Sequence, residues 1–585
     1  MAPARLLSEE AEDVTDHMTQ KRRKLEIRHK DVAGQVHESV KEGLVDKAAT
    51  LQQRLGGTRE DMVEDDETNT AIVSHPYNIR PSGNAYTASR DIKAFAGSFA
   101  ALPDELILQV LEYLEALELV RLGSSCKALY AFCRAEDLWK TLFIEYVSII
   151  SFQCRHLLNL CLRHPPRTPF SWLGSWRSTH LALPSNLQTT IQCTDLYSDA
   201  LYLPFHRAHV SLNAYAQNIP ARNAISRLRN LTADDFNTNW ASKPFILTEP
   251  VQKWPLFNQW SWERLHDKYH NVSFRAEAVD WPYSTYGTYM RNNSDESPLY
   301  LFDCRFAEKM NLTIGDSSTT SLSDFLSSSY TPPFCFQPDL FTALGTHRPD
   351  HRWLIIGPAR SGSTFHADPN GTSAWNAVIR GSKYWILFPP TTDEMPGLHI
   401  SADASEITAP LSIAEYLLNF HAAARRHPGC IEAICDEGEV LHVPSGWYHM
   451  VLNLEDGIAL TQNFVPKAHL VNVLEFLRDK KDQVSGFGRD DVDDKCKVVE
   501  EGGEYDLFVS KLREEGFSGE LETALEEMAR RDEKKGRKSK WEVLTGKAGG
   551  SDDNDAGEDP AGGFSFGFGF ADDDDDDDDD EDEAV

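Results

Sequence analysis

Strand-like alternation of apolar and polar residues fills the middle of the chain. Eight segments between residues 243 and 465 show it at strand length, and turn-forming residues bound each of them. These segments are KPFILTEPV, NVSFRAEAVDW, SPLYLFDCRF, HRWLIIGPA, AVIRGSKYWILFPP, EVLHVPSG, WYHMVLNL and IALTQNFV. Many short strands indicate a sandwich or a barrel. The turn residues EDG, at 455–457, separate the last two segments and predict that these strands pair as an antiparallel hairpin.

Helical periodicity precedes these strands. In LPDELILQVLEYLEALELVRLGSSCKALYAFCRAEDLWKTLF, residues 102–143, Pro103 suits a first helical turn. The apolar positions that recur at helical spacing are Leu106, Val110 and Leu114, followed by Leu119 and Leu122. The pattern predicts a small unit of three helices. A helix is also expected where ISRLRNLTADDF occurs, at residues 225–236.

Much of the acidic surplus lies at the C-terminus. The 585 residues have a formal net charge of −33, but residues 551–585 contain 17 of the 91 acidic side chains and no basic ones. The preceding residues carry 74 acidic and 58 basic side chains, which gives no sign of a basic face of the size that binds DNA. The Asp-rich end and the charged residues 1–97 are expected to remain flexible. The acidic tail would either bind basic partners or only keep the chain soluble.

The ten cysteines and the terminal segments indicate an intracellular protein. The cysteines form no C-x-x-C pair, which fits a reduced compartment. No apolar run approaches the roughly 18 residues that span a bilayer, and the N-terminus lacks the apolar core of a signal peptide. Basic clusters at 21–24 and 530–540 favour the nucleus, although each is equally explained as a solvated charged face. We therefore expect a nuclear protein without a membrane partner, with the cytoplasm as a second location.

One short motif, His366-Ala367-Asp368, offers metal-ligand chemistry. A non-haem Fe(II) oxygenase site uses two imidazoles and one carboxylate and leaves three positions open. Residues two apart on a strand point to the same side, so His366 and Asp368 at a strand end can face one metal ion. His449, 83 residues later in VPSGWYHMVLNL, supplies the third ligand if its strand neighbours the first one. A surface polar pair or a hydrogen-bonded turn is the alternative interpretation.

Lys383 adds to the oxygenase interpretation. It lies in a segment that leads to Phe388-Pro389-Pro390, and a lysine buried inside a barrel is costly unless an anion neutralises it. A dicarboxylate cosubstrate would be such an anion. The alternative is a lysine on the solvent face of its strand between Ser382 and Tyr384, and periodicity does not separate the two.

Residues 102–143 resemble an F-box. The resemblance rests on Leu102-Pro103, the Leu-rich first helix ending in Tyr113-Leu114, then Cys126-Lys127 and Leu138-Trp139. It implies docking to a Skp-type adaptor of a cullin-based ubiquitin ligase, by packing of helices against a groove of the partner. The apolar residues implied in docking are Leu102, Pro103, Leu106 and Leu119.

The segments that carry the histidines resemble the JmjC family of Fe(II)- and 2-oxoglutarate-dependent dioxygenases. The motifs are HADPNGTSAWNAVIRGSKYWILFPP and VPSGWYHMVLNLEDGIALTQNF, and the similarity runs from about residue 230 to 465, with SPLYLFD and RWLIIGPARSGS inside it. Within the family, the motifs match the branch of nuclear lysyl hydroxylases and arginine demethylases once called the phosphatidylserine receptor.

The same resemblance implies roles for individual residues. It makes His366, Asp368 and His449 the iron ligands. The residues that it implies for 2-oxoglutarate are Lys383 and Thr461 at the distal carboxylate, Asn376 near the metal-chelating end, Ser363, where relatives carry Thr, and Asn463. Tyr286 would be an aromatic contact, and Trp375 and Trp385 would be core residues or an apolar shell of the site.

The implied activity is oxidation of a protein side chain with Fe(II), 2-oxoglutarate and O2. Lysine hydroxylation is expected because the resemblance is to that branch, while demethylation of N-methyl Arg or Lys, as in histones, stays open. Basic, Lys/Arg-rich substrates are expected from the acidic charge of the chain, and direct nucleic-acid binding is not indicated. The alternative is a substrate-recognition F-box subunit of a cullin-type ubiquitin ligase with a non-catalytic JmjC barrel.

We therefore expect an α+β chain built on a double-stranded β-helix of the jelly-roll or cupin type, with flanking helices and a small all-α unit before it. The expected divisions are a flexible charged region at 1–97, the F-box at 98–145, a helical linker at 146–229, the JmjC domain at 230–470, a C-terminal helical region at 471–540 and a disordered Gly/Asp-rich acidic tail at 541–585.

Overall fold

The structure, a computed structural model, describes residues 73–158, 171–183, 188–315, 327–392, 394–401, 406–487 and 503–545. The basic cluster at 21–24, the acidic tail and most of the expected flexible N-terminal region lie outside these residues. None of the described helices has the length and the apolar character to cross a membrane.

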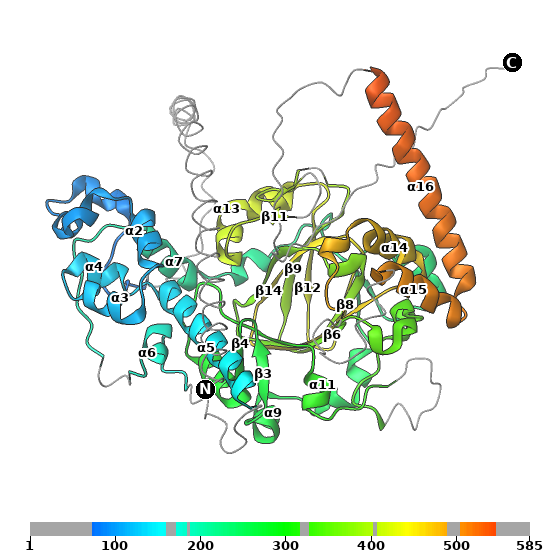
Figure 1. The fold of residues 1–585 in the computed structure, drawn as a ribbon, viewed down its shortest axis with the longest axis horizontal. Helices are drawn as coiled ribbons and strands as arrows, with labels where there is room; N and C mark the ends of the chain where they lie inside the picture. The colour runs from blue at the N-terminus through cyan, green and yellow to red at the C-terminus, as the bar shows by residue number, and fades with distance from the viewer. Residues whose placement is uncertain are drawn as a thin grey trace, which may run out of the picture. The chain divides into compact units, whose positions relative to one another are not determined.

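Two β-sheets form the centre of the described fold (Figure 1). The smaller sheet has four strands in the order β12-β9-β14-β7, and the larger has nine in the order β1-β2-β13-β8-β15-β6-β5-β3-β4. Among these strands every pairing is antiparallel except that of β1 with β2. The predicted α+β fold with a double-stranded β-helix is confirmed.

The strands have the following bounds. The smaller sheet contains β12 (Ile431–Cys435), β9 (Lys383–Phe388), β14 (Tyr448–Asn453) and β7 (Gly362–His366). The larger sheet contains β1 (Ser226–Leu228), β2 (Phe245–Leu247), β13 (Val440–Val443), β8 (Ser373–Arg380), β15 (Gly457–Phe464), β6 (Arg352–Gly357), β5 (Leu301–Asp303), β3 (Ser273–Ala276) and β4 (Val279–Pro282). A separate pair is formed by β10 (His399–Ile400) and β11 (Ile407–Thr408).

The central strands are covered on both faces. In β9, with the sequence KYWILF, every residue is buried, and in β8 only the last of eight residues is not. Aromatic and β-branched residues suit such strands because they pack well on a pleated surface. Lys383 is the first residue of β9 and is among the buried ones.

The predicted hairpin of the last two strand segments is wrong. β14 pairs with β7 and β9, whereas β15 pairs with β6 and β8, so residues 454–456 lead the chain from one sheet to the other. The link from β8 to β9 makes the same crossing at Gly381, which has φ +79°. A Cβ there would lie 2.6 Å from the Asp456 carbonyl oxygen. The two links therefore pack on each other as corners, and the turn residues serve a corner rather than a hairpin.

Four helices rather than the three predicted make up the unit that resembles an F-box. They are α2 (Asp104–Leu111), α3 (Ala116–Gly123), α4 (Lys127–Phe132) and α5 (Glu136–Leu158). Glu118 accepts a hydrogen bond from the backbone N–H of Glu115 at 2.9 Å, which satisfies a free donor at the start of α3. Leu119 is 1% exposed and packs in the core. Its predicted place on the docking surface is therefore wrong.

The remaining helices cover the sheets and extend the chain beyond them. They are α6 (Trp176–His180), α7 (Asp199–His209), α8 (Ala233–Asp235), α9 (Trp262–Tyr269), α10 (Tyr283–Arg291), α11 (Phe306–Lys309), α13 (Ile413–Arg426), α14 (Leu470–Asp479), α15 (Gly503–Glu514) and α16 (Ser518–Thr545). The helix predicted at 225–236 is only partly present, because Ser226–Leu228 pairs with β2 as a strand. Pairing with a neighbouring strand overrides local helical preference there.

Close packing of β7 on β14 fixes the part of the fold that carries the histidines. Gly362 has φ +153°, and a Cβ at this position would lie 1.9 Å from the carbonyl oxygen of Val451. Only glycine permits this approach. The two strands are held in one register, in which His366 lies opposite His449.

Candidate functional site

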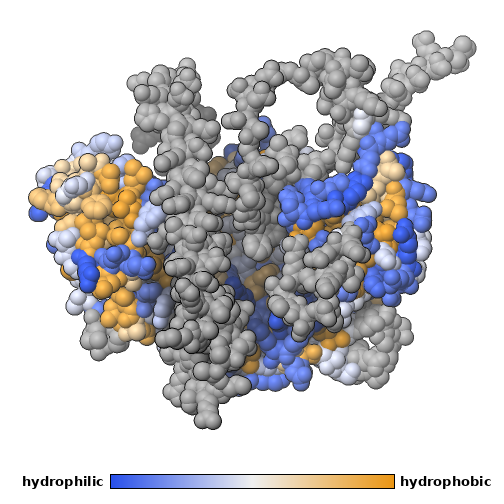
Figure 2. Space-filling view, viewed as in Figure 1, coloured by the Kyte–Doolittle hydropathy of each residue, from blue (hydrophilic) through white to orange (hydrophobic). Residues whose placement is uncertain are grey.

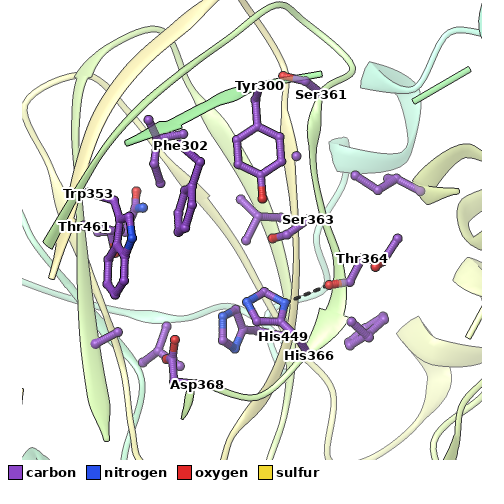
Figure 3. A pocket seen from close by; sticks show the side chains of 18 of the residues that line it. Tyr300, Phe302, Trp353, Ser361, Ser363, Thr364, His366, Asp368, His449 and Thr461 are labelled. Atoms are coloured by element: carbon purple, nitrogen blue, oxygen red, sulfur yellow. Dashed lines mark hydrogen bonds between the residues drawn. The ribbon is translucent and has the colours of Figure 1, made fainter. Parts of the chain in front are cut away.

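Three side chains with metal-ligand chemistry meet where β7 ends. His366 is the last residue of β7, Asp368 follows it in extended conformation, and His449 is the second residue of β14. One ligand atom from each of the three lies within 4.8 Å of the other two. Figure 3 shows the carboxylate of Asp368 beside the two imidazole rings, whose centroids are 4.2 Å apart. The structure therefore brings together the three residues that the sequence motif singled out.

Hydrogen bonds fix which atoms of these side chains are free. Nδ1 of His366 bonds to the carbonyl oxygen of Thr364 at 2.8 Å, and Nδ1 of His449 bonds to that of Trp447 at 3.1 Å. Each Nδ1 must carry the proton to donate to a carbonyl, so each Nε2 presents its lone pair. Oδ1 of Asp368 accepts from Asn463 at 3.4 Å. Its Oδ2 is buried and has no hydrogen-bond partner among the described residues.

Burial disfavours the charged form of all three groups. Burial and the neighbouring His449 lower the pKa of His366 to about 4, and burial lowers the pKa of His449 to about 4. Burial raises the pKa of Asp368 to about 6, against the opposing effects of His366 and Asn463. A divalent cation would favour neutral imidazoles and an ionised carboxylate, which are the forms that ligate metals. The donor set fits the two-histidine, one-carboxylate site of non-haem iron.

All eight residues predicted for the site line one cavity of about 970 Å³. They are Ser363, His366, Asp368, Asn376, Lys383, His449, Thr461 and Asn463. The smaller sheet contributes residues from β7, β9 and β14, and the larger sheet contributes residues from β8 and β15. The cavity thus lies between the two sheets, as a ligand site in a cupin-type barrel does.

Lys383 is a buried cation in this cavity. Its residue is 4% exposed, and burial lowers the pKa of its ammonium to about 8, partly opposed by Cys435. Among the described residues, no carboxylate lies within ion-pair distance of Lys383. The alternative of a lysine on the solvent face is therefore wrong. Because a buried charge without a counter-charge is costly, the cavity is suited to an anion.

Polar residues of β8 and β15 lie side by side on the larger sheet. Thr461 is paired with Asn376 on one side and with Trp353 on the other. The Thr461 hydroxyl donates to the Trp375 carbonyl at 2.9 Å, and Asn463 donates to the Thr372 hydroxyl at 2.8 Å. Oδ1 of Asn376 is buried with no partner among the described residues. These residues leave hydrogen-bonding capacity facing the cavity.

Aromatic residues of the cavity wall were missed from the sequence. Tyr300, Phe302 and Trp353 line the cavity. Phe302 and Trp353 stack with centroids 5.3 Å apart and an interplanar angle of 11°, and Figure 3 shows the Tyr300 hydroxyl directed toward Ser363. Tyr300 and Phe302 are two apart in SPLYLFD, and this spacing on a strand is the signal that could have placed them on one face.

Tyr286 does not line the cavity. Its hydroxyl is buried and donates to the carbonyl of Ile356 at 2.7 Å, so the predicted aromatic contact is not formed. The two tryptophans that were predicted to be core residues or an apolar shell of the site lie in different surroundings. Trp375 packs in the core, whereas Trp385 lines the cavity and stacks on His449, with centroids 5.8 Å apart.

Comparison with known proteins agrees with this geometry. Residues 236–469 match the family described as a Cupin-like domain, and residues 99–145 match the family described as F-box-like. The Arabidopsis thaliana protein named Arginine-specific demethylase JMJ22 is 36% identical over 493 residues, which are 81% of this chain and 88% of that protein. The chain belongs to the JmjC family of Fe(II)- and 2-oxoglutarate-dependent dioxygenases, and it carries an F-box-like segment before its cupin-like domain.

Two further relatives match shorter parts. Lysine-specific demethylase JMJ21 of Arabidopsis thaliana is 33% identical over 391 residues, 63% of this chain and 37% of that protein. The Caenorhabditis elegans protein named Bifunctional arginine demethylase and lysyl-hydroxylase psr-1 is 36% identical over 268 residues, 43% of this chain and 64% of that protein. The three names share demethylation of arginine or lysine, and the third also names lysyl hydroxylation.

Proposed function

We propose that this protein uses Fe(II), 2-oxoglutarate and O2 to oxidise a C–H bond of a Lys or Arg side chain in a protein substrate. One observation carries the proposal. Ligand atoms of His366, His449 and Asp368, whose Oδ2 is buried without a partner among the described residues, converge in a cavity whose wall also holds the buried, unpaired Lys383. A non-catalytic barrel would not require three convergent metal ligands together with a buried lysine.

In this proposal each residue has a separate task. His366, His449 and Asp368 would hold Fe(II), and the Thr364 and Trp447 carbonyls would keep both rings oriented. Lys383 and Thr461 would bind the distal carboxylate of 2-oxoglutarate. Asn376, Ser363 and Asn463 would complete the binding site for 2-oxoglutarate. When bound, iron and 2-oxoglutarate supply the oxidation of the substrate C–H bond by O2.

Charged residues at the cavity support a basic substrate. Glu277, Asp350 and Glu406 line it together with a single surface cation, Arg360. The guanidinium of Arg360 is engaged by the carbonyls of Arg207 and Val210. A cationic side chain would therefore enter past carboxylates that attract it.

Lysine hydroxylation is the first candidate reaction, and arginine demethylation is the second. The second is supported by the name of JMJ22, 88% of whose length this chain covers, and psr-1 is named for both reactions. The test is turnover of 2-oxoglutarate to succinate by the full chain with Fe(II), ascorbate and a Lys/Arg peptide, methylated or not. A product with one added oxygen indicates hydroxylation, and loss of a methyl group with formaldehyde release indicates demethylation. No turnover and no 2-oxoglutarate binding would favour a non-catalytic recognition module.

Affinity for 2-oxoglutarate is expected to fall as the pH rises above about 8. The pKa of Lys383 is lowered to about 8 by burial, so below this pH the ammonium is charged and binds a carboxylate. Above it the neutral amine cannot, and the loss approaches about tenfold per pH unit. The dissociation constant should be measured by calorimetry on both sides of pH 8. The Lys383→Met variant should be weak throughout and lack this dependence, and a wild-type constant that is flat above pH 8 would contradict the role of Lys383.

The F-box-like unit is proposed to bind a Skp-type adaptor. Figure 2 shows hydrophobic surface over this unit, at the left of the view. The large apolar side chains that α2 and α3 and their link expose are Leu106, Val110, Tyr113 and Leu117. Pro103 is exposed and Leu102 half-buried at the same end of α2. An exposed apolar face of short helices suits packing against a partner's groove.

Leu106→Lys is expected to lower adaptor affinity by at least about tenfold, because it places a charge in an apolar contact. Leu106 is 45% exposed, so the melting temperature and 2-oxoglutarate turnover should stay at wild-type values. The matched change Leu119→Ala removes a buried side chain and should instead lower stability by about 2–5 kcal/mol. Calorimetry with a purified adaptor measures the first effect, and unchanged binding by Leu106→Lys would exclude this surface.

Nuclear residence is also proposed. It rests on the basic clusters at 21–24 and 530–540, of which the second lies within α16. Arg531 there is bound by Glu475 and Glu527, which leaves the first cluster as the better import signal. Imaging of the tagged full chain with and without neutralisation of residues 21–24 tests this, and an unchanged nuclear signal would reject the N-terminal cluster.

A further inference from the structure

A short stretch of chain lies between the F-box-like helices and the cavity. Residues 295–302, here named the wall segment, contribute Ser297, Pro298, Tyr300 and Phe302 to the cavity lining. The end of the segment enters β5, which pairs with β6 of the larger sheet. Its other end contacts residues of α5 and α6. One side of the segment therefore faces the site, while its start is held by helices that the site does not contain.

Helices α5 and α6 hold this start through Trp176. On α5, Glu136 accepts a hydrogen bond from the backbone N–H of Trp176 at 2.7 Å. Lys140, one turn further along α5, lies 5.7 Å from the centroid of the Trp176 ring and 3.5 Å from the carbonyl oxygen of Ser297. Trp176 itself is 1% exposed. The F-box-like unit and the wall segment are thus packed as one body around this indole.

Asp295 joins Trp176 to the wall segment. Its carboxylate accepts from Nε1 of Trp176 at 2.9 and 3.0 Å and from the Tyr289 hydroxyl at 2.7 Å. The Tyr289 hydroxyl in turn accepts from the backbone N–H of Leu299 at 2.7 Å. Leu299 immediately precedes Tyr300, whose side chain faces the cavity. A continuous hydrogen-bonded chain therefore runs from α6 to the cavity wall.

We propose that Asp295 is a positioning residue that ties the cavity wall, through Trp176 of α6, to helix α5 of the F-box-like unit, so that this packing helps to set cosubstrate affinity. The inference rests on the proposed function only for its kinetic readout. If Asp295 loses its acceptor oxygens, two buried donors lose their partner, and the Leu299–Tyr300 backbone loses its support. The wall then shifts while the residues proposed to bind the metal, on β7 and β14, stay in place. The F-box-like unit is on this view part of the oxygenase and not a separable docking module.

The test compares Asp295→Ala with Asp295→Asn in the full chain. Asparagine can place its oxygen where both Trp176 and Tyr289 donate, so it should restore wild-type behaviour, whereas alanine removes the acceptor. Asp295→Ala is expected to raise KM for 2-oxoglutarate by about tenfold with kcat within about twofold, the pattern of lost binding without lost chemistry. Arg121→Ala, at an exposed position of α3, is the control and should leave KM unchanged.

Hydrogen–deuterium exchange provides a readout that needs no activity. Amides of the wall segment should exchange faster in Asp295→Ala than in wild type or Asp295→Asn, while β7 and β14 keep wild-type protection. Wild-type protein without turnover would defeat the proposed function, and the exchange data would still decide the inference. Equal KM and equal exchange in wild type and Asp295→Ala would overturn it. An Asp295→Asn variant as impaired as Asp295→Ala would overturn it as well, because a retained acceptor would then not matter.

Discussion

Replacing His366 with alanine is expected to lower 2-oxoglutarate turnover by more than about 100-fold. Changes to groups that only orient a metal ligand cost about 10- to 100-fold, so loss of a ligand should cost more. His366 and His449 face each other on neighbouring strands, and each uses Nδ1 for a backbone carbonyl. Among the residues that the structure describes, no other histidine lies close enough to Asp368 and His449 to replace the lost ligand. Succinate formation measures the effect.

Metal binding should fall together with turnover. Asp368→Asn keeps the size of the side chain but replaces the unpartnered Oδ2 with either an amide nitrogen or a neutral oxygen, and it should weaken Mn(II) affinity in calorimetry. His270→Ala, at an exposed position after α9, is the matched histidine control and should be silent. Turnover retained by His366→Ala, with folding unchanged by circular dichroism, would show that the three residues do not form the metal site.

The local part of this site could be predicted from sequence, and its long-range part could not. His366 and Asp368 are two apart, and strand geometry alone predicts that they share a side. His449 lies 83 residues away, and its contribution depended on an assumption about which strands are neighbours. The register of β14 on β7 settles that assumption, and it depends on Gly362 and the backbone of Val451. Such a contact leaves no periodic signal in the sequence.

Lys383 shows the limit of alternation as a guide. In β9 each residue is buried, so the strand has no polar face and the period of two that marks a half-exposed strand is missing. The sequence therefore allowed both a solvent-facing and a buried lysine. Only the placement of β9 between β12 and β14, with the second sheet opposite, decides for burial.

Two wrong predictions have related causes. The EDG turn was assigned to a hairpin because tight-turn residues between two strand segments usually join paired strands, but here β14 and β15 belong to different sheets and the turn is a corner packed on Gly381. Leu119 and Leu106 both lie on short helices at helical spacing. Periodicity places both on apolar faces, and it does not say which face meets the core and which meets a partner.

Lys383→Met is expected to weaken 2-oxoglutarate binding by roughly 30- to 4,000-fold. Removing one partner of a buried charge pair costs about 2–5 kcal/mol, and about 1.4 kcal/mol corresponds to tenfold. Methionine fills a similar volume without charge, so the cavity keeps its shape and loses only the cation. Both the KM for 2-oxoglutarate and its dissociation constant, measured by calorimetry, should rise. Mn(II) affinity should not change, because His366, Asp368 and His449 are untouched.

The thermal stability of Lys383→Met should not fall with its affinity for 2-oxoglutarate. Burial lowers the pKa of Lys383, which means that the folded protein disfavours the charged form relative to the unfolded chain. A neutral side chain removes that cost, so Lys383→Met should melt at the same temperature as wild type or higher. Lys253→Met, with its side chain 61% exposed, is the matched control and should change neither quantity. A destabilised Lys383→Met protein, or one that binds 2-oxoglutarate as wild type does, would mean that the cavity does not hold Lys383 for an anion.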